Sequence, residues 1–490
     1  MTSKTRSSQI PVLILLCTVQ FMSLLDTSIV QVALPSIQQS FALPNQQLQW
    51  VVTAYAVMCG GFLLLGGRLG DLWGRRRMLM CGMVVFTIAS ALAGLAPGGM
   101  ILILARALQG VGAAIMLPSV LSLISLIFAE GHERNRALGL LGTISAVGFT
   151  SGLILGGLLT ATLGWRFIFY VNIPIGLIIL VLSPKLLPES TKVKQPLDVL
   201  GAITVTGAFV AFLYALTIAG SQGWHSLLTT GLILLSILLF LFFLIIERHT
   251  KYPLMSFSIF SQGSFIGAIT ASLLFGAIMG SSVYLINLYL QNILGYRPLM
   301  AAFSFLPQEL LTMVAAGFVS RLVSKSGVQL ILSAGMISFG LGLWLLTFIT
   351  PTMGYLYAVL PGTLFIGLGA ALVLVSGSIA ATAGIHPEQQ GLASGLWNTG
   401  PQIGTALGIA IVSAVTNLDT NPVQVQVQGS SVSMAESALG VSGFQSAFAT
   451  AMIFAGIGLC SALLCNRKNK DQSDTARSRP SGHPTKKRSM

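Results

Sequence analysis

The segment Leu227-Leu-Thr-Thr-Gly-Leu-Ile-Leu-Leu-Ser-Ile-Leu-Leu-Phe-Leu-Phe-Phe-Leu-Ile-Ile-Glu247 decides the fold class. Its first 20 residues carry no charge. A helix of about 20 apolar residues has the length that crosses the ~30 Å hydrocarbon core of a bilayer. The segment therefore predicts a transmembrane helix.

Thirteen other apolar runs of comparable length lie before and after this segment. Together with it, the runs are approximately 10–33, 48–69, 78–96, 100–128, 136–162, 167–187, 197–219, 227–247, 264–292, 298–323, 328–349, 354–384, 389–415 and 444–465. We therefore expect an all-α polytopic membrane protein with 14 transmembrane helices. Because the number is even, both termini are expected on the same side of the membrane.

The composition excludes a soluble protein. Of the 490 residues, 54% are apolar and only 8% are charged, whereas an ordinary soluble domain has about 25% charged residues. The net charge of +13 could indicate a nucleic-acid partner, but 23 of the 26 Lys and Arg residues lie at the chain ends or in alternate connections. Basic residues collect on the cytoplasmic side, so we expect cytoplasmic termini, a cell-membrane location and no nucleic-acid partner.

Three ionisable residues lie inside predicted spans, where such a group costs about 2.5–3.5 kcal/mol: Asp26, Arg106 and Glu309. Asp26 belongs to a polar stripe that includes Gln31. We interpret it as a protonatable carboxylate on a water-filled pathway. Loss of water favours the neutral acid and a nearby cation favours the carboxylate, so a moving cation can load and release a proton. The alternative is a structural carboxylate that pairs within the bundle.

Arg106, beside Gln109 and Gly110, is expected at a depth similar to that of Asp26, so the two side chains could face one cavity. We interpret Arg106 as a proton-coupling cation, and a permanent salt bridge is the alternative. Glu309 follows Pro307, which frees a helix carbonyl. Glu309 could attract a cationic substrate or carry a second proton, or it could be a neutral, hydrogen-bonded side chain.

The connection after the second run reads Gly67-Arg-Leu-Gly-Asp71-Leu-Trp-Gly74-Arg75-Arg76-Arg77. Its glycines permit close helix approach and a tight turn. Its acidic residue can face a helix N-terminus, and its arginines can pair with a carboxylate at the end of a neighbouring helix. We interpret this connection as a gate that closes in one state and opens in the other. The alternative is that its basic residues only set the membrane orientation by the positive-inside rule. The gate residues that we predict are Gly67, Asp71, Gly74, Arg75, Arg76 and Glu130.

Polar and aromatic side chains within the spans are candidates for a substrate cavity, although interhelical hydrogen bonding or plain packing would explain them equally well. These candidates are Gln31, Tyr55, Gln109, Asn287, Gln291, Asn398 and Gln402. The five cysteines lack metal-ligand spacing, and the sequence contains neither a nucleophile–base set nor a nucleotide-binding loop. We therefore expect no enzyme activity, no metal, no cofactor, and a proton gradient as the energy source.

Two halves are indicated by a weak internal repeat. Gly139, Gly148 and Gly152 share their spacing with glycines at positions 395, 404 and 408, an offset of 256 residues. Each triplet lies in a helix that follows a predicted cytoplasmic connection. Repeated halves are typical of transporters.

Several motifs carry a resemblance to a known family. The segment from Gly67 to Arg77 resembles the cytoplasmic signature of the major facilitator superfamily, and Leu102-x3-Arg106-x2-Gln109-Gly110-x-Gly112-Ala113-Ala114 resembles its helix-4 motif. The helix-1 segment Leu25-Asp26-Thr27-x-Ile29-Val30-Gln31-Val32-Ala33-Leu34-Pro35 is similar to that of the fourteen-span drug:proton antiporters. The segments 49–55 and 165–174 are also similar to that branch.

The resemblance implies a two-bundle fold and alternating access, with Asp26 and Arg106 in proton coupling and Asp71 with Arg75 in the gate. The implied organisation is a cytoplasmic N-terminus (1–9), a six-helix bundle (10–187), two linker helices (197–247), a second six-helix bundle (264–465) with an extracytoplasmic loop (416–443), and a basic cytoplasmic tail (466–490).

The chain departs from the branch at three positions. The helix-5 antiporter motif normally has a proline where this chain has Leu153, although its glycines are present. Gln31 stands at a usual asparagine position, and Ser324 replaces the acidic residue in the second copy of the cytoplasmic signature. The matching motif glycines are Gly139, Gly148, Gly152, Gly156 and Gly157.

The sequence predicts a monomeric, proton-coupled exporter of hydrophobic or cationic small molecules. A nutrient or metabolite importer on the same fold is the first alternative. A non-transporting membrane sensor is the second, but no connection is long enough for a signalling domain.

Overall fold

Each predicted apolar run coincides with a helix, or with two consecutive helices, in the computed structural model. The structure describes residues 3–128, 132–189, 199–250, 263–350, 352–383, 385, 390–418 and 432–464. In the first half the helices are α1 (Ser3–Phe41), α2 (Asn45–Leu48), α3 (Trp50–Trp73), α4 (Arg75–Leu95), α5 (Gly99–Ile127), α6 (His132–Thr162), α7 (Phe167–Tyr170) and α8 (Asn172–Leu186). They are followed by α9 (Val199–Gln222) and α10 (Leu227–His249). In the second half they are α11 (Gly263–Leu288), the π-helix η2 (Tyr289–Ile293), α12 (Pro298–Phe303), α13 (Leu306–Ser326), α14 (Val328–Leu346), α15 (Tyr355–Ala358), α16 (Leu360–Thr382), α17 (Gln390–Leu418) and α18 (Val432–Leu464).

The structure establishes a helical, multi-pass membrane protein. Eleven helical segments of the described residues are long and apolar enough to cross a bilayer. Three shorter apolar helices, Trp50–Leu63, Val147–Thr162 and Ile203–Leu216, occupy the remaining runs. A count of fourteen spans therefore stays a prediction.

Three predicted boundaries differ from the observed ones. The run 298–323 is divided into α12 and α13, because Pro307 has no backbone N–H to continue a helix and stands in the first turn of α13. Helix α1 already begins at Ser3, inside the predicted N-terminal segment. Helix α18 begins at Val432, so only 419–431 of the predicted loop lies between helices, and this stretch lies outside the described residues, as does the tail 466–490.

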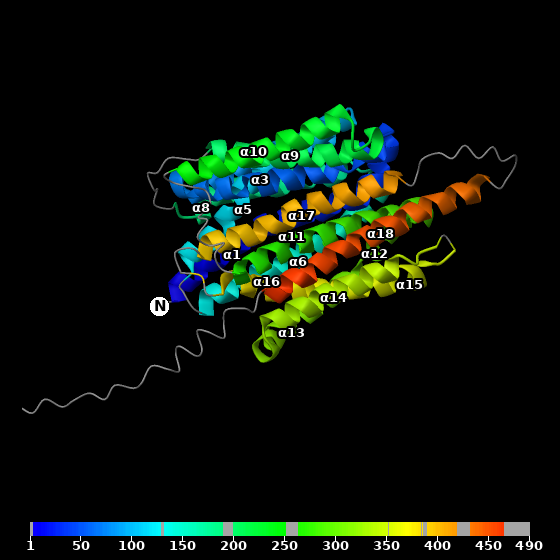
Figure 1. Cartoon of the computed structure of the whole chain (residues 1–490). Coiled ribbons are helices and arrows are strands. Elements are labelled where there is room, and N and C mark those ends of the chain that lie inside the picture. Colours follow the sequence, from blue (N-terminus) through cyan, green and yellow to red (C-terminus); the bar gives the residue numbers. More distant parts are fainter. Residues whose placement is uncertain are drawn as a thin grey trace, which may run out of the picture.

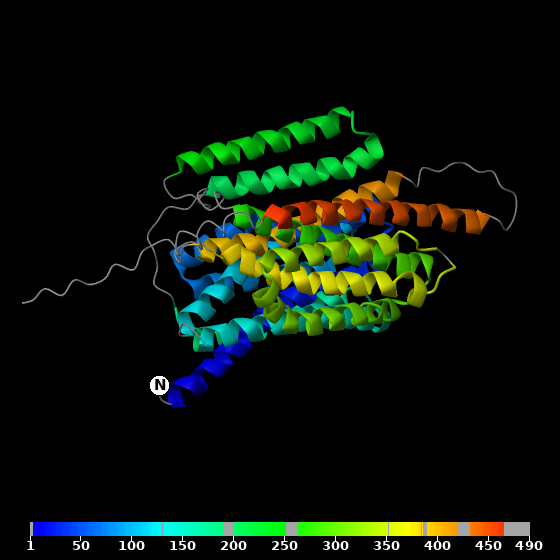
Figure 2. The ribbon, with the colours of Figure 1, turned by 60° about the horizontal axis from the view of Figure 1, so that its bottom comes forward.

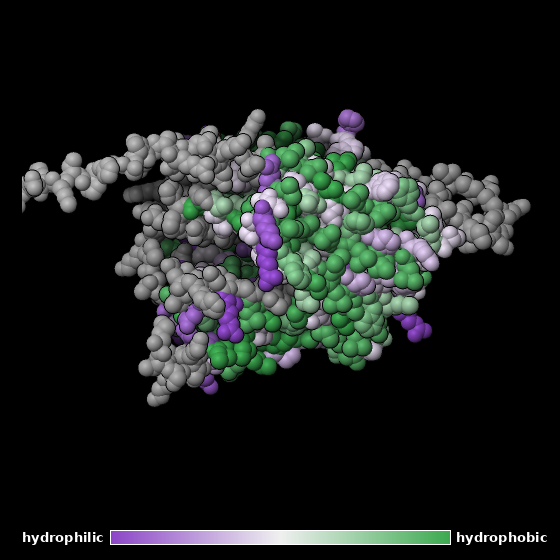
Figure 3. Space-filling model, turned by 90° about the horizontal axis from the view of Figure 1, so that it is seen from below, coloured by the Kyte–Doolittle hydropathy of each residue, from purple (hydrophilic) through white to green (hydrophobic). Residues whose placement is uncertain are grey.

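The long helices lie side by side, with the chain's N-terminus at one end of the bundle (Figure 1). We call that end the N-face. We call the opposite end the far face; it includes the turn at Gly223 and the end of α1 at Phe41. The pair α9 and α10 packs along the outside of the other helices (Figure 2). Hydrophobic residues dominate the described surface in Figure 3, as expected for a surface that contacts lipid.

The two halves repeat one pattern of helix contacts. In the first half α1 packs on α6, α4 on α5, and α3 on α5. In the second half α11 packs on α17, α14 on α16, and α13 on α16. The halves meet through α3 with α17 and through α6 with α12, and α9 contacts both α3 and α17.

Contacts between the halves can be traced to residues in the middle of the bundle and toward the far face. The added Cβ of Gly60 in α3 would lie 2.9 Å from Ile403 of α17, and that of Gly157 in α6 would lie 2.8 Å from Leu299 of α12. Small residues let membrane helices approach this closely. The two halves are therefore in close contact from the middle of the bundle toward the far face.

Candidate proton-coupling site

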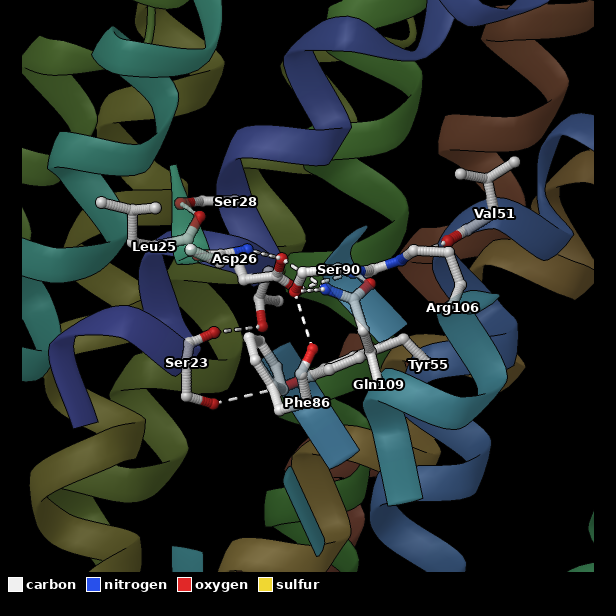
Figure 4. Close-up of polar contacts among 12 residues, drawn as sticks. Ser23, Leu25, Asp26, Ser28, Val51, Tyr55, Phe86, Ser90, Arg106 and Gln109 are labelled. Atoms are coloured by element: carbon white, nitrogen blue, oxygen red, sulfur yellow. Dashed lines mark hydrogen bonds and ion pairs between the residues drawn. The ribbon is translucent and has the colours of Figure 1, made fainter. Parts of the chain in front are cut away.

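Asp26 of α1 lies at the centre of a buried polar network (Figure 4). Its Oδ2 accepts a hydrogen bond from Arg106 Nη1 at 2.6 Å. Its Oδ1 accepts one from Gln109 Nε2 at 3.2 Å and one from Asn172 Nδ2 at 2.7 Å. The structure thus brings Asp26 and Arg106 together, and three donors from two further helices hold the carboxylate.

Arg106 is held on several sides as well. Its Nε donates to the carbonyl of Val51 at 3.0 Å, and its Nη1 also donates to Gln109 Oε1 at 2.8 Å. Its guanidinium carbon lies 4.6 Å from the ring centroid of Tyr55, a cation–π arrangement. These contacts with neutral groups do not involve Asp26.

The amide of Gln109 is fully used. Besides the contacts above, its Nε2 donates to Ser90 Oγ of α4 at 2.7 Å, and Ser90 Oγ donates to the carbonyl of Phe86. The hydroxyls of Tyr55 and Ser23 lie 3.2 Å apart. Tyr55 and Gln109, predicted to line a substrate cavity, instead belong to the network around Arg106 in this conformation.

Asp26 does not lie on an open water pathway in this structure. Its exposed fraction is 0% and that of Arg106 is 1%. The physical reason is that the protein's own donors fill the positions around the carboxylate that water would otherwise take. The predicted pathway to water therefore requires another conformation.

The antiporter-motif glycines explain how α6 packs against the helix that carries Asp26. A Cβ atom on Gly148, Gly152 or Gly156 would lie 2.9, 2.5 or 2.7 Å from the α1 carbonyl oxygens at positions 21, 25 and 29. Glycine therefore permits direct contact of the two backbones at four-residue intervals. Gly139 lies in α6, and its surroundings lie outside the described residues.

The second half repeats this packing. A Cβ atom on Gly404 or Gly408 of α17 would overlap the carbonyl oxygen of Leu273 or Ala277 of α11. Helix α17 thus contacts the first helix of its half through glycines, as α6 does. This correspondence agrees with the offset of 256 residues in the sequence.

We expect Gly152→Ala to destabilise the protein by about 1–3 kcal/mol, because the new methyl group would overlap the Leu25 carbonyl and the Ser28 hydroxyl. The matched control is Gly67→Ala, whose Cβ would lie 3.6 Å from Pro118 Cβ, an ordinary contact. This control should stay within about 0.5 kcal/mol of the unmodified protein. The midpoints of thermal unfolding in detergent measure both effects, and equal losses would contradict the packing described here.

Glu309 forms a separate polar site in the second half. It is buried in the first turn of α13, and its Oε1 accepts a hydrogen bond from Gln308 Nε2 at 3.2 Å. Gln308 Oε1 is buried without a hydrogen-bond partner. The Asp26 network described above draws its side chains from the first half, so the structure does not bring Glu309 into it.

The amides of Asn287 and Gln291 connect the two halves. Asn287 Nδ2 donates to the Gln31 carbonyl at 2.6 Å, and Gln291 Nε2 donates to the Val32 carbonyl at 2.9 Å. Pro35 cannot donate to the carbonyl four residues before it, so it leaves that of Gln31 free. Asn287 lies in α11 and Gln291 in η2, which continues α11. We call these two bonds the α1–α11 bridge, and interhelical bonding rather than cavity lining describes this pair. Of the other cavity candidates, Asn398 is exposed, and Gln402 is half-buried beside Gly60.

The predicted gate is described only in part. Gly74, between α3 and α4, has φ +103°, so it makes the turn that needs glycine. Arg75 donates to the Ser122 carbonyl at 3.0 Å. Asp71 lies in α3 with its side chain outside the described part, and Glu130 lies outside the described residues.

A carboxylate that was not predicted lies at this gate. Glu189 lies 3.4 Å from Arg76 and 3.6 Å from Arg77. Arg76 also donates to the carbonyl of Leu187 at 3.1 Å. Glu189 closely follows the predicted span 167–187, and that position was the signal that could have found it.

The comparison with known families identifies the chain. A sequence profile of the Major Facilitator Superfamily matches residues 16–409. The chain belongs to the major facilitator superfamily. It is 36% identical over 414 residues to the puromycin resistance protein pur8 of Streptomyces alboniger. The matched region covers 82% of this chain and 81% of the relative. It is 34% identical over 425 residues to the cephamycin export protein CmcT of Amycolatopsis lactamdurans, covering 86% and 87%.

Solved structures agree on the fold of this superfamily member. A bacterial homologue of the human lysosomal transporter Spinster, in an inward-facing and unoccupied conformation, matches with a TM-score of 0.66 at 14% identity. The match covers 95% of this chain and 98% of that one. At this identity the likeness shows the fold alone.

In this superfamily member Asn172 and Ser90, which bond directly to Asp26 and Gln109, were not among the predicted site residues. Asn172 begins α8, and its signal was an amide inside an apolar run. Ser90 offered no signal, because serine is common in membrane helices. Two hydrogen bonds stabilise the turn before α7. Trp165 Nε1 donates to Ser40 Oγ at 2.9 Å, and Arg166 donates to the Ala96 carbonyl at 3.3 Å.

Proposed function

We propose that this superfamily member is a proton-coupled exporter of hydrophobic or cationic small molecules that works by alternating access. In this proposal two six-helix bundles move against each other, α9 and α10 are inserted between them in sequence, and the N-face is cytoplasmic. The protein acts as a monomer in the cell membrane, with protons and its small-molecule substrate as partners. The proton gradient supplies the energy, and no cofactor takes part.

The observation that carries the proposal is the ion pair between Asp26 and Arg106. An ionisable pair this deep in a membrane protein is costly and is therefore a functional candidate. The described basic residues support the orientation, because Arg75, Arg76, Arg77 and Lys185 lie near the N-face, whereas Arg166 and Arg297 lie near the far face.

A proton on Asp26 would change the contacts that hold α1. The neutral acid no longer forms an ion pair with Arg106, so the attraction between α1 and α5 weakens. Arg106 keeps its contacts with the Val51 carbonyl and with Gln109, and so it stays buried. Protonation therefore favours a different position of α1, while the guanidinium of Arg106 remains hydrogen-bonded to neutral acceptors.

The α1–α11 bridge connects that movement to the contact between the halves. Gln31 is five residues beyond Asp26, about 7.5 Å along the same helix. A shift of α1 at Asp26 is therefore transmitted to the carbonyls that Asn287 and Gln291 bind. The glycine contacts between α6 and α1 allow the helices to slide, as small shear movements require. In the proposed cycle this structure is a state closed at the far face.

The substrate class rests on the relatives and on Glu309. The relatives are named for puromycin resistance and cephamycin export, which supports export of small molecules that include antibiotics. In our proposal the buried carboxylate of Glu309 attracts a cationic substrate or carries a second proton. Substrate must bind more tightly to the state without the Asp26 proton, because coupling requires a difference in affinity between states.

Everted membrane vesicles from an efflux-deficient host test the proposed function, with ethidium as a cationic probe. In everted vesicles the cytoplasmic side of the protein faces outward. We therefore expect ethidium to accumulate when the vesicle interior is acidified, because protons leave as the substrate enters. Collapse of the pH gradient should release the probe. Accumulation only under the reversed gradient would support an importer, and no response to either gradient would support a sensor.

A further inference from the structure

The buried amide of Asn172 has one unexplained atom. Its Nδ2 donates to Asp26 Oδ1 at 2.7 Å, but its Oδ1 is buried without a hydrogen-bond partner. The whole side chain is inaccessible to solvent. Because buried carbonyl groups are nearly always paired, an idle acceptor next to a protonatable carboxyl needs an explanation.

The other partners of Asp26 cannot receive a proton from it. Arginine has no acceptor atom, so Arg106 can donate to Asp26 in either protonation state but cannot accept a hydrogen bond from its O–H group. Gln109 has an acceptor, but its Oε1 is held by Arg106 at 2.8 Å and its Nε2 by Ser90 at 2.7 Å. The titratable or charged side chains near the pair on neighbouring described helices are Arg106 of α5 and Tyr55 and Cys59 of α3. The other helices packed around the pair present neutral groups: α4 presents Ser90, α8 presents Asn172, and α6 presents backbone at its glycines.

We propose that Asn172 is a positioning residue that binds both protonation states of Asp26 by rotating its amide. With the carboxylate, Nδ2 donates to Asp26 Oδ1, as observed. When Asp26 meets water in another conformation and a proton adds to its Oδ1, the amide turns by half a revolution and its oxygen accepts a hydrogen bond from the new O–H group. The proton returns to water in the reverse step, so nothing else is consumed.

The geometry favours this rotation over other rearrangements. The amide oxygen and nitrogen exchange places, so neither the backbone nor the packing has to move. One amide atom lacks a partner before the rotation and one lacks a partner after it, so the number of unmade bonds does not change. The inference rests on the proposed function, since it describes how the proposed site holds its proton.

Infrared difference spectroscopy of the full-length protein in lipid vesicles tests the proposal without a substrate. The carbonyl stretch of protonated Asp26 is followed through a pH titration and identified by its loss in Asp26→Asn. Asn172→Leu, of similar size, removes a charge-assisted bond from the carboxylate and a weaker neutral bond from the acid. We therefore expect the midpoint of the titration to rise by about one pH unit.

Rotation predicts a second signature. A side-chain amide band should change with protonation in the unmodified protein and be absent from both Asn172→Leu and Asp26→Asn. Ser183→Ala, a buried polar change on the same helix whose hydroxyl bonds only to the Ile179 carbonyl, should leave the midpoint and the band unchanged.

Three outcomes decide the matter. An unchanged midpoint in Asn172→Leu, or an amide band that persists in it, would overturn the role of Asn172 and leave the proposed function standing. If the unmodified protein has no titrating carboxyl band that Asp26→Asn removes, the proposed function fails. If Asn172→Leu does not fold, Asn172→Asp serves instead, since two adjacent carboxyls that share a proton should raise the midpoint further.

Discussion

Replacing Asp26 with asparagine is expected to abolish proton-driven efflux while the protein still reaches the membrane. Asparagine has the shape of the carboxylate, and its oxygen can still accept the hydrogen bond from Arg106. Asparagine cannot bind a proton at any physiological pH, so the two conformational states of the transport cycle can no longer differ by one bound proton. Accumulation of ethidium in everted vesicles with an acidified interior, normalised to the amount of folded protein, measures the loss.

The matched control for this variant is Ser28→Ala. Ser28 is a buried polar residue two positions away on α1, and its hydroxyl bonds only to carbonyls of its own helix. We expect this change to retain gradient-driven efflux. If Asp26→Asn retains full efflux, the assignment of Asp26 is wrong. If both variants lose efflux equally, the loss reflects disturbed packing of α1 and does not support a role of Asp26 in proton coupling.

Replacing Arg106 with leucine is expected to have the second-largest effect. The change leaves a buried carboxylate without a cation, and breaking a buried pair in this way costs about 3–5 kcal/mol. Without the Arg106 cation the carboxylate of Asp26 is no longer stabilised for proton release, so efflux should fall to background. The thermal unfolding midpoint and vesicle efflux measure the two consequences.

The combination of Asp26→Asn with Arg106→Leu separates stability from transport. The double variant contains no unpaired buried charge, so its stability should exceed that of Arg106→Leu alone, although efflux stays absent. Neighbouring residues in one network give non-additive free energies in such a cycle. Strictly additive losses of stability would contradict a direct interaction between the two side chains.

Much of the fold was predictable because the bilayer imposes one rule. A run of about 20 apolar residues has to satisfy its backbone groups internally, so it forms a helix. Counting residues from the ends of two such helices placed Asp26 and Arg106 at similar depths, where the structure shows them in contact. Pro307 marked the division between α12 and α13 for an equally local reason.

The parts that could not be predicted depend on the main chain or on the conformation. The acceptors at Val51, Gln31 and Val32 are backbone carbonyls, which exist at every position and leave no mark in a sequence. Only Pro35 pointed to one of them. The closed surroundings of Asp26 belong to one state of a moving protein, and residue types alone do not specify a state.

The most direct measurement of the central claim counts protons during substrate binding. Purified protein in weakly buffered detergent solution is mixed with ethidium, and an indicator dye reports the protons released, with Asp26→Asn measured in parallel. The account predicts that the unmodified protein releases protons as ethidium binds, whereas Asp26→Asn binds ethidium without release. Equal release by both proteins, or binding by the unmodified protein with no release at any pH, would contradict it.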